Sequence, residues 1–224
     1  MAIGRKDWFV LDSETIYLTH GSYGACLKDA FDYRLQWQAK LESQPFKFFT
    51  EDLFIHLEKS RKSLGNYIQC HYDDIVFFPN PTTAMNAILR SLNFSSKDQI
   101  LTTNHEYGAI EKTWKFLSNK FGFDYIKIPI NIPFNDEQSF IDSFENSITP
   151  KTRVIFLSHI TSPTGLIFPV SEICKMAKKH NILSIIDGAH VPGHISMDIS
   201  ALDADIYVGA CHKWMCAPKG VSFL

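Results

Sequence analysis

From residue 75 onward the chain alternates between short apolar runs and longer amphipathic stretches, and no other feature of the sequence restricts the fold as strongly. The near-continuous apolar runs cover residues 75–78, 99–103, 124–129, 153–159, 183–187, 205–210 and 221–224. Helical periodicity separates most of them, over residues 83–92, 109–121, 137–147 and 170–180. Buried strands separated by helices indicate an α/β fold, with a mostly parallel sheet covered by helices on both faces.

The first 70 residues lack this alternation. Residues 1–22 indicate an extended arm that leads into the motif Thr-His-Gly-Ser-Tyr-Gly at 19–24, whose glycines would let the backbone approach a ligand closely. Helical spacing runs from Cys26 to about residue 69, is interrupted at Pro45, and includes one helix that ends near Gly65. We therefore expect an N-terminal arm and helices over 1–70 and a large α/β domain over 71–224, truncated in its last strand.

Composition excludes several classes of protein. The 224 residues carry a formal net charge of −2 without a basic block, so neither nucleic acid nor an anionic membrane is an expected partner. The five cysteines are odd in number and form no Cys-x-x-Cys pair, which argues against a disulfide framework or a zinc site. No apolar segment follows the charged residues at 1–7, and no run is long enough to span a bilayer. We therefore expect a cytoplasmic protein.

An acid and an amine follow two of the predicted strands. Asp187 ends the run at 183–187, and Lys213 comes shortly after the run at 205–210. Because ligands bind beyond the carboxyl ends of parallel strands, both side chains are expected at one edge of the sheet. This pair suits pyridoxal phosphate, since the amine can form a Schiff base and the acid can keep the pyridine nitrogen protonated.

Polar groups follow the other predicted strands as well. Asn-Pro-Thr-Thr at 80–83 opens a helix, where hydroxyls and free amides can hold a phosphate, although a simple helix cap is an alternative. His105 could stack on a flat cofactor ring or be an ordinary loop residue. A hydroxyl-rich turn covers 158–165, and His190 and His212 lie beside the acid and the amine. The combination favours a cofactor site more strongly than any single group does.

Other chemistries lack their motifs. The chain contains no Gly-x-Ser-x-Gly elbow for a serine hydrolase and no Gly-x-Gly-x-x-Gly after the first predicted strand for a dinucleotide. His190 and His194 are four residues apart, but Pro192 and Gly193 between them disrupt the helix that would direct both rings at a metal ion. We expect no metal site.

Together these segments resemble the class V aminotransferase family of fold type I pyridoxal-phosphate enzymes, with the strongest likeness to isopenicillin N epimerase-like proteins. The resemblance extends over nearly the whole chain and is carried by the motifs at 19–24, 80–86, 104–107, 158–165, 187–190 and 212–220. It implies that 71–224 is the large cofactor-binding domain of such an enzyme.

The resemblance also implies a role for individual residues. Lys213 would carry the cofactor and move protons at the substrate α carbon, Asp187 would pair with the pyridine nitrogen, and His105 would stack on the ring. These three are the expected catalytic residues. The remaining contacts to the phosphate and to the ring hydroxyl would come from Thr82, Thr83, Ser162, His190 and His212. The substrate side would be formed by His20, Gly21, Ser22 and Tyr23.

Two positions depart from the pattern of relatives. Ser162 stands where many of them keep an asparagine near the ring hydroxyl. Ala210 stands where desulfurase-type relatives often carry a serine three residues before the lysine, so one phosphate contact would be missing or replaced. The resemblance implies a homodimer and an amino-acid substrate that reacts at its α carbon.

Several outcomes remain open for the reaction. Isopenicillin N epimerase-like chemistry is the leading interpretation, and a carbon–sulfur lyase, a cysteine desulfurase or an aminotransferase are the alternatives. Enzymes of this kind are larger, with a C-terminal small domain that supplies an arginine for the substrate carboxylate, and these 224 residues would lack it. A further alternative is therefore an inactive truncated fragment that keeps a partial cofactor pocket.

Overall fold

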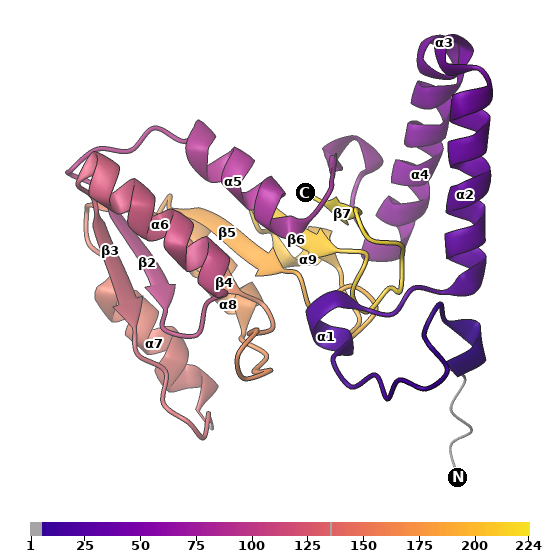
Figure 1. The fold of residues 1–224 in the computed structure, drawn as a ribbon. Coiled ribbons are helices and arrows are strands. Elements are labelled where there is room, and N and C mark those ends of the chain that lie inside the picture. Colours follow the sequence, from indigo (N-terminus) through magenta and orange to yellow (C-terminus); the bar gives the residue numbers. More distant parts are fainter. Residues whose placement is uncertain (1–5, 135) are drawn as a thin grey trace.

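The computed structural model describes residues 6–134 and 136–224, and its ribbon is drawn in Figure 1. The expectation that residues 1–7 carry no targeting signal therefore lies largely outside the described residues. Every helix within the described ranges is too short or too polar to cross a bilayer.

A seven-stranded mixed sheet forms the centre of the described chain, in the order β1-β7-β6-β5-β4-β2-β3. The five strands from β6 to β3 run parallel to one another, whereas β7 is antiparallel to both of its neighbours. The strands are β1 (Phe77–Phe78), β2 (Gln99–Thr103), β3 (Asp124–Ile128), β4 (Thr152–Ser158), β5 (Leu183–Gly188), β6 (Ile206–Ala210) and β7 (Ser222–Phe223). The mostly parallel sheet expected from the sequence is confirmed.

Helices cover both faces of this sheet (Figure 1). Val154 and Phe156 of β4 pack with α5 and α6, and Ile155 and Leu157 pack with α7 and α8. Side chains alternate between the faces of a strand, so a strand that is apolar at every position requires a cover on each side. The helices are α5 (Pro81–Ser91), α6 (Gly108–Phe121), α7 (Glu137–Ser147), α8 (Val170–Lys179) and the short α9 (Ile199–Leu202).

A helical hairpin projects from the sheet (Figure 1), and it comprises α2 (Lys28–Ser43), α3 (Pro45–Lys47), a π-helical segment (Phe48–Asp52) and α4 (Leu53–Ile68). The predicted interruption at Pro45 is confirmed, but the predicted end of the helix near Gly65 is wrong. Gly65 lies inside α4, which continues to Ile68 and is capped by Gln69 with a φ of 54°. A glycine suits position 65 because a Cβ there would lie 2.6 Å from the Cys70 carbonyl oxygen.

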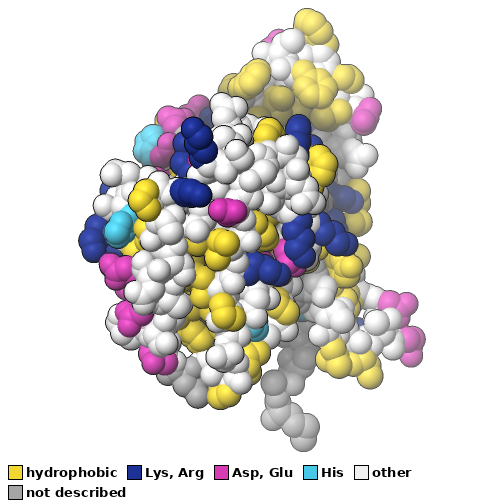
Figure 2. Space-filling model, turned by 90° about the vertical axis from the view of Figure 1, so that its left-hand side faces the viewer, with side chains coloured by type: hydrophobic (Ala, Val, Ile, Leu, Met, Phe, Trp, Pro, Cys, Tyr) yellow, Lys and Arg dark blue, Asp and Glu magenta, His cyan; other side chains and the backbone are white. Residues whose placement is uncertain are grey.

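Hydrophobic side chains gather on the outer end of this hairpin (Figure 2), where Phe46 is 82% exposed and Phe49 is 53% exposed. The arm before the hairpin has little regular structure between a 3₁₀ turn (Lys6–Trp8) and α1 (His20–Tyr23). Within the motif at residues 19–24, His20–Tyr23 form one turn of helix, which Gly24 ends with a φ of 68°.

Candidate active site

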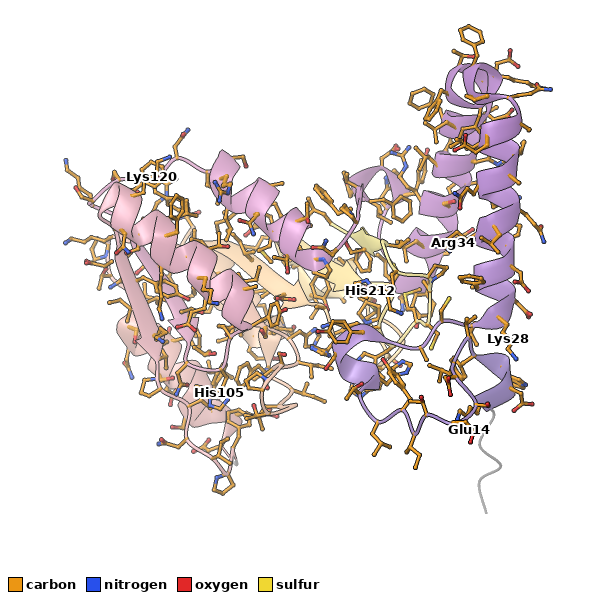
Figure 3. The ribbon with its side chains drawn as sticks, viewed as in Figure 1. Glu14, Lys28, Arg34, His105, Lys120 and His212 are labelled. Carbon is orange, nitrogen blue, oxygen red and sulfur yellow. The ribbon has the colours of Figure 1, made fainter. Side chains whose placement is uncertain are left out.

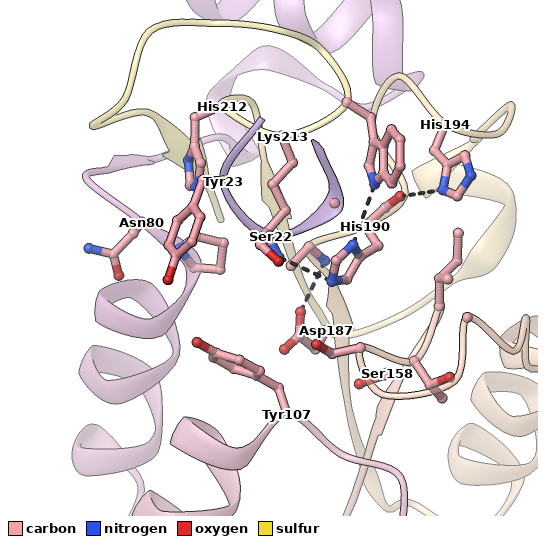
Figure 4. A pocket seen from close by; sticks show the side chains of 18 of the residues that line it. Ser22, Tyr23, Asn80, Tyr107, Ser158, Asp187, His190, His194, His212 and Lys213 are labelled. Atoms are coloured by element: carbon pink, nitrogen blue, oxygen red, sulfur yellow. Dashed lines mark hydrogen bonds between the residues drawn. The ribbon is translucent and has the colours of Figure 1, made fainter. Parts of the chain in front are cut away.

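A cavity of about 700 Å³ opens at the carboxyl ends of β4, β5 and β6, and α1 and the start of α5 form its other walls (Figure 4). Parallel strands place the residues that follow them along one edge of the sheet, as the sequence predicts. The residues that meet there are separated by almost the whole chain, from Leu18 to Trp214.

Asp187 and Lys213 both line this cavity. Asp187 is 5% exposed, and its carboxylate accepts a hydrogen bond from the amide of Ala189 at 3.0 Å. Burial raises the pKa of Asp187, while the Ala189 amide and the charge of Lys213 act in the opposite direction. Burial also lowers the pKa of Lys213, against the attraction of Asp187. The structure thus brings together the acid and the amine that the sequence indicates, in a partly desolvated site.

His190 contacts both Lys213 and Trp214. Its Nε2 lies 3.1 Å from Lys213 Nζ, and its Nδ1 accepts a hydrogen bond from Trp214 Nε1 at 3.4 Å. Burial lowers the pKa of His190 to about 4, so its ring is neutral at pH 7. Figure 4 shows both contacts as dashed lines. Among the described residues, no three His, Cys, Asp or Glu side chains gather as ligands for a metal ion.

The N-terminus of α5 forms the end of the cavity at which an anion would bind best. Thr82 lines the cavity at the first turn of the helix, where backbone dipoles favour negative charge. Thr83 does not line it, and its amide donates to the Asn80 side chain at 2.8 Å. The amide of Thr83 is therefore used in the helix cap, which is the alternative to a phosphate contact that the sequence left open for this segment.

His212 lines the cavity, and its Nδ1 lies 3.1 Å from the carbonyl oxygen of Val221. A proton on Nδ1 donates to that oxygen, so Nε2 is the ring nitrogen that remains to meet a ligand. Burial is the largest influence on the pKa of His212 and lowers it.

His105 is not on the cavity wall. It is 9% exposed, and its ring nitrogens lie 3.1 Å from Thr164 Oγ1 and 3.2 Å from the Ile130 carbonyl oxygen. Figure 3 shows His105 well away from His212 and α1. The aromatic ring that does line the cavity after β2 is Tyr107, which is 44% exposed and faces Asp187 in Figure 4. Sequence reasoning identified the correct strand end but not this residue.

Glu106 is a second group that the sequence reasoning missed. Its carboxylate is 7% exposed and accepts hydrogen bonds from Thr103 Oγ1 at 2.6 Å and from the Ser158 hydroxyl at 2.7 Å and amide at 2.9 Å. Burial raises the pKa of Glu106 to about 7. Ser158 lines the cavity and pairs in register with Asp187, so Glu106 supports the wall from behind.

Three of the four substrate-side candidates on α1 line the cavity, and His20 does not. Gly21, Ser22 and Tyr23 line the cavity. His20 instead faces the lysine loop, which is the segment 211–221 between β6 and β7, and its Nε2 lies 3.1 Å from the Lys213 carbonyl oxygen. Gly24 has a φ of 68°, and a Cβ there would lie 1.9 Å from the His212 carbonyl oxygen.

One further candidate lines the cavity. Ser162 does so from the turn that follows β4, as expected from its place in the hydroxyl-rich segment. His194 also lines the cavity, although sequence reasoning considered it only as a metal ligand.

Several known proteins are similar to this chain in sequence and fold. Isopenicillin N epimerase from Streptomyces clavuligerus is 31% identical over 215 residues, which cover 96% of this chain and 54% of that protein. A probable L-cysteine desulfhydrase from Arabidopsis thaliana is 25% identical over 228 residues, which cover 95% of this chain and 48% of that protein. The chain thus spans about half the length of these curated relatives.

A solved structure of the cystine C-S lyase C-DES with its reaction product cysteine persulfide matches with a TM-score of 0.85 at 26% identity, over 94% of this chain and 57% of that one. The family model for class-V aminotransferases matches residues 25–224. That match covers far more than half of the sequence, and the chain belongs to the aminotransferase class-V family.

Proposed function

We propose that this chain binds pyridoxal phosphate in the cavity through Lys213, as the cofactor-binding part of an enzyme that acts at the α carbon of an amino acid. One observation carries the proposal: a desolvated amine and a buried carboxylate face the same cavity from neighbouring strand ends. Family membership and a related C-DES structure that holds glycine covalently linked to its PLP cofactor support it.

The shape and polarity of the cavity fit this cofactor. The phosphate of the cofactor would lie at Thr82 and His212, and the pyridine nitrogen of the cofactor would face Asp187. Tyr107 would cover the ring face, the role that the family resemblance implied for His105, which does not reach the cavity. Further polar contacts would come from Ser162 and His190, while Thr83 would act through the helix cap.

Each residue then has a chemical task. Bound pyridoxal phosphate supplies an electron sink that stabilises negative charge at the α carbon of an amino acid. Asp187 would keep the ring nitrogen protonated at the far end of the ring, because a buried carboxylate is stabilised by a positively charged hydrogen-bond donor. Lys213 would take and return the α proton, and its lowered pKa makes the free amine more available at neutral pH.

Epimerase-type proton transfer is our leading proposal for the reaction, because two of the relatives, at 31% and 30% identity, are isopenicillin N epimerases. A carbon–sulfur lyase is the second candidate, supported by the desulfhydrase relatives and the C-DES match. A desulfurase that uses a cysteine of this chain has less support. Neither Cys211 nor Cys216 lines the cavity, and burial raises the pKa of Cys211 to about 12.

The cofactor proposal is tested by absorbance and covalent trapping. Added pyridoxal phosphate should give a visible band that borohydride removes, with the label recovered on Lys213 by peptide mass spectrometry. Lys213→Arg should abolish the band, because a guanidinium cannot form the bond. Lys219→Arg is the matched control: this nearby lysine donates to the Gly24 carbonyl oxygen and does not line the cavity. A label on another lysine, or no band at saturating cofactor, would disprove the proposal.

The reaction is tested by parallel assays on cofactor-loaded protein. Exchange of the α proton for deuterium with inversion, and without sulfide or pyruvate, would support the epimerase. Sulfide and pyruvate from cysteine or cystine would support the lyase instead. Amino-group transfer to a keto acid as the main reaction would overturn both candidates.

For the whole protein we propose a cytoplasmic homodimer. The exposed apolar side chains on the hairpin are consistent with association. The 224 residues alone are proposed to bind the cofactor weakly and to turn over slowly, because the chain spans about half the length of its relatives. Turnover equal to that of a full-length relative would contradict this proposal.

A further inference from the structure

The hydrogen-bond partners of His190 restrict where its proton can lie. The indole Nε1 of Trp214 carries a hydrogen and can only donate, and it lies 3.4 Å from His190 Nδ1. His190 Nδ1 must therefore offer a lone pair. Because burial keeps this imidazole neutral near pH 7, its single proton must then sit on Nε2.

That proton points at Lys213. His190 Nε2 lies 3.1 Å from Lys213 Nζ, and an Nε2–H group can only donate across that distance. An ammonium has three donors and no acceptor, whereas a neutral amine has a lone pair. The Nε2–H form of His190 is therefore compatible with a neutral lysine and opposes its protonation.

We propose that Trp214 is a positioning residue that selects the Nε2-protonated form of His190, and that this form holds Lys213 as a neutral amine facing the cavity. The inference deepens the proposed function, on which it rests, by naming the residues that set the protonation state of the essential amine. Protonating Lys213 requires His190 to move its proton to Nδ1, which places two hydrogens against each other at the Trp214 contact.

Two histidine rings pack against the indole of Trp214. The ring of His194 stacks on it with centroids 4.3 Å apart and an interplanar angle of 22°, and the ring of His20 lies 4.9 Å away on a tilt of 35°. Gly21 approaches so closely that a Cβ there would lie 3.1 Å from the indole. Because these groups hold the ring, the Nε1–H direction is fixed before any ligand arrives.

The groups around Lys213 determine how strongly its protonation is favoured in the absence of the Trp214–His190 contact. Asp187 on β5 attracts a proton to Lys213, and burial of the amine acts in the other direction. The other titratable groups around the amine and its two partners come from α1, from the loop after β5, from the lysine loop and from the start of α6, and they are His20, Tyr23, His194, His212, Lys219 and Tyr107. Asp187 is the charged group that raises the pKa of Lys213, so it is the main group whose effect the Trp214–His190 contact opposes.

The first test reads the tautomer directly in the cofactor-free full chain. Long-range ¹H–¹⁵N correlation spectra of protein with ¹⁵N-labelled histidine should show His190 with a bare Nδ1 and a protonated Nε2. The His190→Gln spectrum assigns the signal by its loss. In Trp214→Phe, which keeps an aromatic ring but lacks the donor, the two tautomers should mix. A protonated Nδ1 in the unmodified protein would overturn the proposal.

The second test measures the lysine without any cofactor. Trace acetylation by acetic anhydride, followed by peptide mass spectrometry at Lys213 across pH, gives the midpoint at which the neutral amine appears. Loss of the Trp214 donor should raise this midpoint by about one pH unit, a roughly tenfold loss of labelling below the midpoint. Trp37→Phe on α2, whose indole packs against His56 far from the cavity, is the matched control and should leave the midpoint unchanged.

A sharper variant guards against misfolding. Site-specific 3-benzothienylalanine at position 214 keeps the size and stacking of the indole and replaces only the N–H group with sulfur. It should mix the His190 tautomers and raise the Lys213 midpoint as Trp214→Phe does. An unchanged tautomer and midpoint with this residue would overturn the inference. Both readouts are independent of pyridoxal phosphate, so a failure of the cofactor proposal would be recognised separately.

Discussion

Glu106 is the buried acid whose ionisation should be most visible in the stability of the protein. Its pKa is about 7 in the fold against a usual value of 4.5, so between these limits the folded carboxyl keeps a proton that the unfolded chain releases. The free energy of unfolding should therefore fall by roughly 3 kcal/mol as pH rises from 4.5 to above 7. Glu106→Gln should flatten this dependence in urea titrations at several pH values.

A control for Glu106 lies on the surface of α6. Glu111 pairs with Lys127 at 2.7 Å and with Lys115 at 2.9 Å, and these lysines lower its pKa. Its contribution therefore has the opposite sign, since it is present above its unfolded pKa and is lost as pH falls through its folded pKa. Glu111→Gln should remove a small stabilisation at neutral pH. Equal pH profiles for the two variants would refute the role given to Glu106.

The side chains that sequence reasoning located correctly are those whose direction follows from the strand itself. Asp187 lies within β5, and Lys213 follows β6 closely, so their position at the sheet edge could be predicted. The turn after β2 is different, because its backbone path buries His105 and turns Tyr107 into the cavity. Which of two neighbouring residues faces a ligand depends on turn dihedrals that neither composition nor periodicity contains.

At the scale of elements, α1 approaches the lysine loop so closely that position 24 requires a glycine. Gly24 combines a φ of 68° with a ψ of 154°, a region open almost only to glycine, and has no room for a Cβ beside His212. Gly24→Ala should reduce the free energy of unfolding by more than about 3 kcal/mol, from strain and steric overlap together. Chemical denaturation followed by circular dichroism measures the loss.

Gly165 provides the comparison for Gly24. Its φ of 66° is nearly the same, but a Cβ at this position would meet no described atom within 4 Å. Gly165→Ala therefore carries only the conformational cost of about 1–2 kcal/mol. If both variants lost the same stability, the close approach at Gly24 would not matter.

The cap of α5 should behave as an ordinary cap in the empty protein. Asn80 accepts from the Thr83 amide at 2.8 Å, and Asp136 caps α7 in the same way from the Ser139 amide at 2.9 Å. Asn80→Ala and Asp136→Ala should each lower the free energy of unfolding by about 1 kcal/mol. The two should differ once pyridoxal phosphate is added, because only Asn80→Ala frees an amide beside Thr82. Identical shifts on adding the cofactor would contradict an anion site at α5.

At the scale of the whole molecule, the sheet and the projecting hairpin should differ in local stability. No residue of α2 is buried, whereas α8 buries Val170, Ile173, Cys174, Met176 and Ala177. Amide hydrogen exchange in α2 should therefore be much faster than in α8, because its opening exposes little apolar surface. Strong protection of α2 that grows with protein concentration would instead show that a second copy covers the hairpin.

The sheet and its two helix layers could be predicted from the sequence more fully than the bounds of the helices in the first 70 residues. The seven apolar runs and the helices between them specify both layers, because each buried strand face needs a cover. The extension of α4 past Gly65 and the one-turn helix at α1 could not be predicted, since both depend on contacts with residues distant in sequence or across a loop.

The bond between α1 and the lysine loop has a consequence for how the protein is made. His20 and Lys213 are 193 residues apart, and Gly24 and Lys219 are 195 apart. Closing so long a segment has a large entropic cost, which contacts of this kind recover only after the intervening sheet has formed. During synthesis the segment around α1 leaves the ribosome first and has no surface to dock against until residues 212–219 follow. The cavity therefore cannot be completed before residues 212–219 have left the ribosome.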